Sequence, residues 1–114
     1  MSEGDRSLAA QTTRMWESGE SIPSVEVLLS SITGGTLSDR TDAVLVDQKC
    51  RWQQGIQISA EHYLHRCPDL ASDRQSRWCI VAGEFTARGG DAQLVRELSE
   101  RFPDLVDDLQ GLVS

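Results

Sequence analysis

A glycine stop followed by a short helix and a proline break occurs twice in this chain, and this repetition limits the possible folds more than any other feature. The first copy spans residues 55–70 and ends in Pro-Asp-Leu. The second spans residues 90–105 and ends in the same three residues, 35 positions later. Upstream, a tryptophan followed three residues later by glycine recurs after 36 positions, at Trp16 and Trp52. These spacings predict a unit of about 35 residues, made of a long helix and a short one, present roughly three times.

The chain has 114 residues, which is the length of one ordinary domain. A period of this size is also typical of tetratricopeptide-type solenoids. The two helices of the unit are unequal, however, and the small-residue pattern of those repeats is absent. No segment alternates apolar and polar residues as a strand would. We therefore predict an all-α fold, a compact bundle of about six to seven helices in a single domain. Its expected parts are disorder at residues 1–4, pseudo-repeat units at residues 5–35, 38–70 and 71–105, and a C-terminal helix at residues 104–113.

Capping residues and helix breakers predict the boundaries of these helices. Serine and aspartate favour the position just before a helix, whereas glycine and proline commonly end one. Predicted N-caps are Ser24, Ser59 and Asp91, with Ser38 or Asp39 before the third helix and Asp69 or Ser72 before the fifth. Predicted stops are Gly55, Pro68, the Gly89-Gly90 pair and Pro103. The expected helices cover residues 5–18, 25–31, 39–54, 60–66, 72–88 and 92–102, followed by the C-terminal one.

Apolar residues recur at helical spacing and indicate the core. In the fourth helix, Ala60, Tyr63, Leu64 and Cys67 share one face. The three tryptophans are large enough to dominate the packing energy, and we expect them in or next to the core. The predicted core and motif residues are Trp16, Trp52, Gly55, Tyr63, Leu64, Pro68, Leu70, Trp78, Phe85, Leu98, Phe102, Pro103 and Leu105.

The charge of the chain argues against several classes of partner. Its 11 basic and 18 acidic residues give a formal net charge of −7, and the basic residues are scattered. Duplex binding normally uses a concentrated basic surface, so nucleic acid and anionic membranes are disfavoured. An acidic surface suits a basic protein partner better. No apolar run approaches the roughly 18 residues of a membrane span, and residues 2–6 do not resemble a signal peptide. We expect a cytoplasmic protein.

His62, His65 and Cys67 are the one cluster with metal-ligating side chains, and they define an alternative hypothesis. A zinc site would need further ligands, from Cys50 and Cys79, and neither lies in a paired motif. We expect instead solvated histidines, a Cys67 that packs with the apolar face, and reduced cysteines. The carboxylates Asp47, Glu61, Glu84 and Glu97 are expected on helix exteriors, so no catalytic residue, metal or cofactor is predicted. Arg51, Arg66 and Arg101 are expected to pair locally with acidic residues.

Two stretches resemble a known family. Residues 47–55 carry an Asp, Arg-Trp and Gly, and residues 61–70 carry Glu, Tyr-Leu, Arg, Pro and Leu in the pattern found in planctomycete-type bacterial serine/threonine protein kinases. There the pattern lies in the N-terminal helical region, and residues 98–105 resemble its second copy. Cys67 departs from the family, which usually has Phe at that position. The chain carries no glycine-rich nucleotide loop and none of the other catalytic motifs of a kinase.

The resemblance implies a non-catalytic accessory domain of a larger signalling kinase. Its partner would be a protein: the kinase domain in cis, a second copy of itself, or a docked substrate. Three alternatives remain open. They are a stand-alone helical adaptor, a small enzyme or metal protein that uses His62, His65 and Cys67, and a transcription-associated module, which would need a basic helix face.

Overall fold

The computed structural model of the chain describes residues 8–17, 24–32 and 34–112, and the all-α prediction is confirmed there. No strand occurs among these residues. Their eight α-helices and one 3₁₀ helix are α1 (Leu8–Glu17), α2 (Val25–Ser31), α3 (Leu37–Gln53), α4 (Ala60–Arg66), α5 (Pro68–Ser72), α6 (Arg74–Ala87), α7 (Ala92–Arg101), η2 (Pro103–Leu105) and α8 (Val106–Gly111). The expected disorder at residues 1–4 falls outside the described residues.

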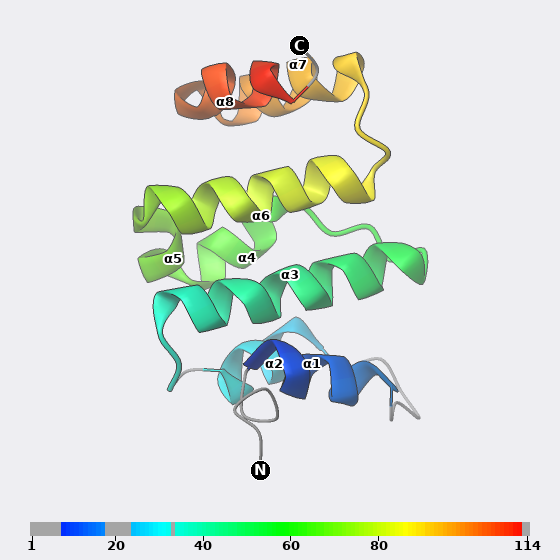
Figure 1. Cartoon of the computed structure of the whole chain (residues 1–114), viewed down its shortest axis with the longest axis vertical. Helices are drawn as coiled ribbons and strands as arrows, with labels where there is room; N and C mark the ends of the chain where they lie inside the picture. Colours follow the sequence, from blue (N-terminus) through cyan, green and yellow to red (C-terminus); the bar gives the residue numbers. More distant parts are fainter. Residues whose placement is uncertain (1–7, 18–23, 33, 113–114) are drawn as a thin grey trace.

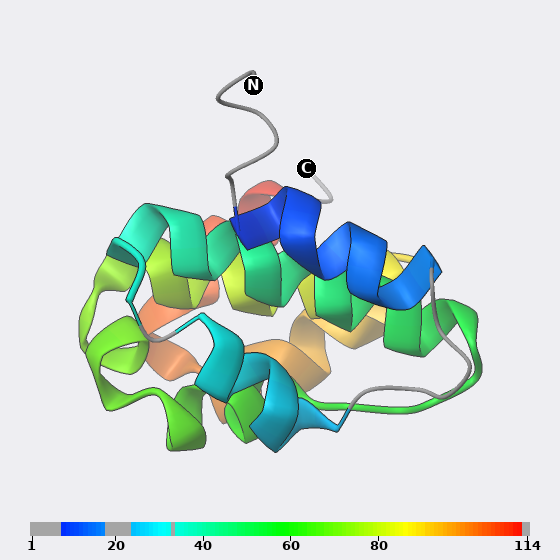
Figure 2. The same cartoon turned by 90° about the horizontal axis from the view of Figure 1, so that it is seen from below.

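The helices stack in layers along the long axis of the molecule (Figure 1). α1, α3 and α6 follow one another as neighbouring layers, and α7 and α8 close the stack. α3 and α6 are parallel, because Thr41 Oγ1 and Ser76 Oγ lie 2.9 Å apart near their starts, whereas the Arg88 guanidinium lies over the Trp52 ring near their ends. Figure 2 shows α2, α4 and α7 on the other side of the molecule from α1. The first helices of the three units (α1, α3 and α6) therefore form one row, and the second helices (α2, α4 and α7) form another.

The core lies between these two rows of helices. Tyr63, Leu70, Leu98 and Leu105 are completely buried, together with Leu28 and Ile80 from neighbouring helices. Leu64, Phe85 and Phe102 are at most 8% exposed. The three tryptophans are only partly buried, and Trp52 and Trp78 pack against the edge of the core. Gly55, Pro68 and Pro103 are exposed at the helix boundaries.

The pseudo-repeat is visible in the backbone. Cys67 (φ −126°, ψ 76°) and Phe102 (φ −130°, ψ 71°) end their helices in nearly the same conformation. Both precede proline, which excludes helical geometry from the residue before it. The glycine alignment needs one correction. Gly55 (φ +81°) corresponds to Gly89 (φ +97°), not to Gly90, because each is the second residue after its helix.

Two predicted helix starts are wrong. Thr36, not Ser38 or Asp39, caps α3, since its hydroxyl accepts a hydrogen bond from Asp39 N at 3.1 Å. The predicted fifth helix is two helices, because the Asp73 carboxylate accepts from Ser76 N at 2.9 Å and starts α6 after the short α5.

Proline and capping side chains mark the remaining helix boundaries. Pro68 not only follows the end of α4 but also occupies the first turn of α5, where its missing N–H is tolerated. The C-terminal segment begins as the 3₁₀ helix η2 and continues as α8. Ser24 and Asp91 are N-caps as predicted.

Candidate functional site

An apolar groove of about 610 Å³ lies between α3 and α6. Trp52 and Trp78 line it from the two helices, and small residues of α6 form part of its wall. Groove-lining residues are Leu45, Gln48, Lys49, Trp52, Gln53, Trp78, Cys79, Ala82, Gly83, Thr86 and Ala87. Pockets of this size with aromatic walls and few polar groups are typical binding sites. We call this feature the α3/α6 groove.

Gly83 sets the distance between the two helices that form the groove. A Cβ atom at this position would lie 2.1 Å from Gln48 Oε1 and 3.0 Å from a Leu45 methyl carbon, so only glycine permits the observed approach. The Gln48 side chain is buried in this contact, and its Nε2 donates to Ile80 O at 2.9 Å. This hydrogen bond ties α3 to α6 beneath the groove. The groove is therefore part of a tightly packed helix pair.

The indole of Trp52 is fixed from two sides. Its Nε1 donates to Ile58 O at 3.0 Å, and the Arg88 guanidinium carbon lies 5.9 Å from the ring centroid. The segment before α4 and the C-terminal end of α6 thus hold this side of the groove in place. A preformed aromatic surface loses little conformational entropy when a ligand binds.

Lys49 is the one charged residue among those that line the groove. Within residues 8–17, 24–32 and 34–112, no ion pair is formed by Lys49. By contrast, seven arginines form ion pairs: Arg40, Arg51, Arg66, Arg74, Arg77, Arg88 and Arg101. The groove therefore combines an apolar surface with one available positive charge.

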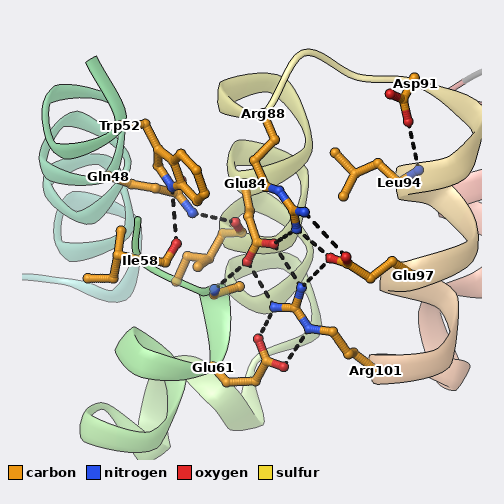
Figure 3. Close-up of polar contacts among 12 residues, drawn as sticks. Gln48, Trp52, Ile58, Glu61, Glu84, Arg88, Asp91, Leu94, Glu97 and Arg101 are labelled. Atoms are coloured by element: carbon orange, nitrogen blue, oxygen red, sulfur yellow. Dashed lines mark hydrogen bonds and ion pairs between the residues drawn. The ribbon is translucent and has the colours of Figure 1, made fainter. Parts of the chain in front are cut away.

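A buried glutamate organises the charged cluster next to the groove (Figure 3). Glu84 is 1% exposed, and its carboxylate accepts from Ala60 N at 2.7 Å, from Arg88 Nη1 at 2.9 Å and from both terminal nitrogens of Arg101 at 2.8 and 2.9 Å. Glu97 pairs with both arginines, and Arg101 also pairs with Glu61 on α4. The cluster joins α4, α6 and α7.

The electrostatics of this cluster favour ionised side chains. Burial raises the pKa of Glu84, but hydrogen bonds from Arg101, Ala60 N and Arg88 outweigh it and leave that pKa below its ordinary value. The hydrogen bonds that Arg101 donates to Glu61 and Glu84 raise the pKa of Arg101, and the hydrogen bond that Arg88 donates to Glu97 lowers the pKa of Glu97. Because Glu84 accepts four hydrogen bonds, its carboxylate is saturated. These hydrogen bonds hold α4, α6 and α7 together, and they occupy both oxygens of Glu84, so this carboxylate is not arranged for proton transfer.

A second buried carboxylate joins α1, α3 and α4. Asp47 is completely buried and accepts from Arg51 Nε at 2.6 Å, Tyr63 OH at 2.7 Å and Trp16 Nε1 at 3.1 Å. The Arg51 guanidinium carbon also lies 5.3 Å from the centroid of the Trp16 ring. Burial, followed by the Asp47 charge, raises the pKa of Tyr63. Asp47 is thus another saturated structural centre.

The placement of Asp47 and Glu84 on helix exteriors is therefore wrong. Sequence reasoning missed both because helix exteriors are the default for carboxylates. One available signal was the spacing of Asp47 and Arg51, which lie four residues apart on α3 and pair when helical. Glu61 and Glu97 are exposed as expected. The expected local pairing holds for Arg51 and for Arg101, which pairs with Glu97 four residues away. Arg101 also reaches Glu61, and Arg66 reaches Glu26, each 40 residues away.

The histidines and cysteines differ in how deeply they are buried. His62 is half-buried, and its ring meets Tyr63 edge-on at a centroid distance of 6.3 Å. Burial and the Arg66 charge lower the pKa of His62. His65 is exposed, whereas Cys67 is buried in the core, where burial raises its thiol pKa. No group of three or more His, Cys, Asp or Glu side chains able to hold a metal ion occurs among the described residues.

No protein-family model matches this chain, and no curated protein or solved structure is similar to it at a significant level. Within the described ranges, no helix combines the length and apolar character needed to cross a membrane.

Proposed function

We propose that this chain is a non-catalytic protein-interaction domain that binds its partner in the α3/α6 groove. The observation that carries the proposal is the groove itself: an apolar surface with two tryptophans in its lining and about 610 Å³ of space. Aromatic side chains supply a large contact area at low entropic cost and dominate many protein interfaces. The saturated carboxylates Asp47 and Glu84 support a structural role for the buried charges.

The partner we propose is a serine/threonine kinase domain linked to this chain in cis. The support is the sequence resemblance of residues 47–70 and 98–105 to the N-terminal helical region of planctomycete-type kinases. In this proposal the domain regulates the kinase, and self-association and substrate docking are the other uses of the same groove. The pairing of seven arginines with acidic side chains supports a protein partner over nucleic acid, since few cations remain for phosphate.

The test begins with the genomic reading frame beyond Ser114. If it encodes a kinase domain, that domain is purified and titrated with this chain by calorimetry. Ala82 lies half-buried in the groove wall, so Ala82→Glu places a charge in the apolar surface with little effect on the core. We expect this substitution to weaken binding by at least roughly tenfold, as loss of an interface anchor does.

Ala92→Glu is the matched control, because it makes the same change at an exposed position at the start of α7. It should leave the affinity unchanged. Equal affinity of the Ala82→Glu and native chains would overturn docking in the groove. A reading frame without a kinase domain would overturn the kinase proposal and leave a stand-alone adaptor.

A further inference from the structure

We infer that the occupant of the α3/α6 groove is an amphipathic helix with aliphatic side chains at positions i, i+4 and i+7 and a carboxylate that pairs with Lys49. This inference rests on the proposed docking function and specifies the chemistry of the partner. It is carried by the length of the groove, the small residues in its wall and its single charge.

The two tryptophans give the length of the partner segment. Trp52 lies level with Arg88, which stacks over its ring, and Trp78 precedes Arg88 by ten residues on α6. At 1.5 Å per helical residue, the two tryptophan positions are separated by about 15 Å along the groove. That distance corresponds to between two and three helical turns. A partner helix can therefore place three side chains of one face, at i, i+4 and i+7, between the two indoles.

The wall between the tryptophans favours aliphatic anchors. Ala82 and Ala87 leave room beside α6 because their side chains are small, whereas Gln48 and Leu45 of α3 fill the space beside Gly83. Branched aliphatic side chains such as leucine fill such hollows and gain burial against the flanking indoles. Polar lining residues such as Gln53 and Thr86 have no net charge.

The positive charge of Lys49 favours a partner helix that carries a negative charge next to these aliphatic anchors. It is exposed on α3, between the levels of Leu45 and Trp52, and forms no ion pair in the described part of the chain. A carboxylate on the flank of the partner helix would neutralise it in a partly apolar setting. The remaining polar face of the partner should be neutral or basic, because the chain as a whole carries a net charge of −7.

A second copy of this chain fits the groove poorly. Among the described residues, the large exposed hydrophobic side chains are Val27, Leu37 and Leu112. Val27 lies in α2, Leu37 starts α3 and Leu112 follows α8, so they do not form a stripe on one helix. The exposed surface of the described part therefore offers no helix with anchors at i, i+4 and i+7.

The probes are two 15-residue helical peptides with three leucines at i, i+4 and i+7. One carries glutamate beside each end leucine and the other carries glutamine there. Binding is measured by tryptophan fluorescence and by protection of cysteines from alkylation, read by mass spectrometry. Cys79 lines the groove, whereas Cys50 is also half-buried but lies outside it and serves as the internal control. We expect the glutamate peptide to protect Cys79 and not Cys50.

We expect the glutamate peptide to bind roughly fivefold more tightly than the glutamine peptide, the size of one partly exposed ion pair. Lys49→Gln should abolish this preference. Arg96→Gln should preserve it, because Arg96 also shows no ion pair but lies on α7, outside the groove.

No saturable binding of the glutamate peptide, or equal affinity of both peptides, would overturn the inference. A concentration-dependent dimer that Ala82→Glu dissolves would also overturn it, because the groove would then hold a second copy. Charge-selective peptide binding without binding of the kinase domain would leave this inference standing and overturn only the kinase proposal.

Discussion

Asp47 shows how one side chain can hold three helices together. Its two oxygens accept hydrogen bonds from Trp16 on α1, from Arg51 on α3 and from Tyr63 on α4. A buried charge is tolerated only when it is paired and its remaining lone pairs are satisfied. Asp47 meets both conditions, and its hydrogen bonds fix the orientation of the Trp16, Arg51 and Tyr63 side chains.

Replacing Asp47 with asparagine should destabilise the fold by about 3 to 5 kcal/mol, because the buried Arg51 guanidinium would lose its charge partner. Urea unfolding followed by circular dichroism measures the change in free energy. Asp42→Asn, at an exposed position of the same helix, should stay within about 0.5 kcal/mol of the native chain. A stable Asp47→Asn variant would refute the proposed role of this ion pair.

The lowered pKa of Glu84 predicts how stability depends on pH. The unfolded state takes up a proton at the ordinary glutamate pKa of 4.5, while folded Glu84 stays ionised to lower pH. Its contribution is therefore complete above that value and is lost as the pH falls through the lowered folded pKa. Unfolding free energies measured between pH 6 and pH 3 should decline below about pH 4.5.

Glu84→Gln should make this decline shallower, and Glu100→Gln, at an exposed position of α7, should leave it as it is. An unchanged slope in Glu84→Gln would show that other carboxylates cause the acid sensitivity.

Sequence reasoning at the residue scale identified packing residues better than buried polar ones. The spacing of Tyr63, Leu64 and Cys67 marks an apolar face, and hydrophobic burial depends on little else. Burial of Asp47 and Glu84 depends on donors from other helices, such as Trp16 Nε1 and Ala60 N. No local pattern around either carboxylate contains those donors.

Helices α4 and α7 occupy equivalent places in the repeat but are capped differently. The Asp91 carboxylate accepts from Leu94 N at 2.8 Å, as a capping side chain does. Ser59 occupies the same position before α4 without a side-chain capping hydrogen bond, and Glu84 accepts from Ala60 N there. A carboxylate from another helix thus helps to satisfy the start of α4.

Alanine substitutions at the two caps should therefore differ. Asp91→Ala should cost about 1 kcal/mol, because it removes a capping hydrogen bond. Ser59→Ala should cost less than about 0.5 kcal/mol, because its hydroxyl makes no such bond. Chemical denaturation of both variants gives the comparison, and a larger cost for Ser59→Ala would contradict the assignment of Glu84 to this helix start.

At the element scale, local chemistry predicted several boundaries and left others ambiguous. Ser24, Gly55 and Asp91 are the strongest capping signals in their segments, and all three act as expected. Thr36, by contrast, competes with two other capping residues within three positions. The choice among them follows from where α3 packs on its neighbours. The α3/α6 groove has the same origin, since it depends on the approach of two helices at Gly83.

Across the whole molecule, two ion pairs repeat at a spacing of 35 residues. Arg66 at the end of α4 pairs with Glu26 on α2, and Arg101 at the end of α7 pairs with Glu61 on α4. Each pair connects the second helix of one repeat unit to the second helix of the preceding unit. The repeated sequence thus produces a repeated contact.

The two arginines should nevertheless differ in their contribution. Arg66→Gln should cost under about 1 kcal/mol, because both side chains of its pair are at least 36% exposed. Arg101→Gln should cost about 2 to 3 kcal/mol, since it also removes hydrogen bonds from the buried Glu84. Guanidinium denaturation of the two variants measures the difference. Equal losses would mean that Glu84 contributes nothing beyond the repeated pair.

The layered stacking predicts which helices unfold locally most often and which least often. α3 and α6 each lie between two neighbouring layers, so their amide protons should exchange with deuterium later than those of the outer helices. The groove is built on the two helices for which we expect the slowest exchange. Its walls would keep their shape while the ends of the stack open and close, and a partner would meet the most persistent surface of the molecule.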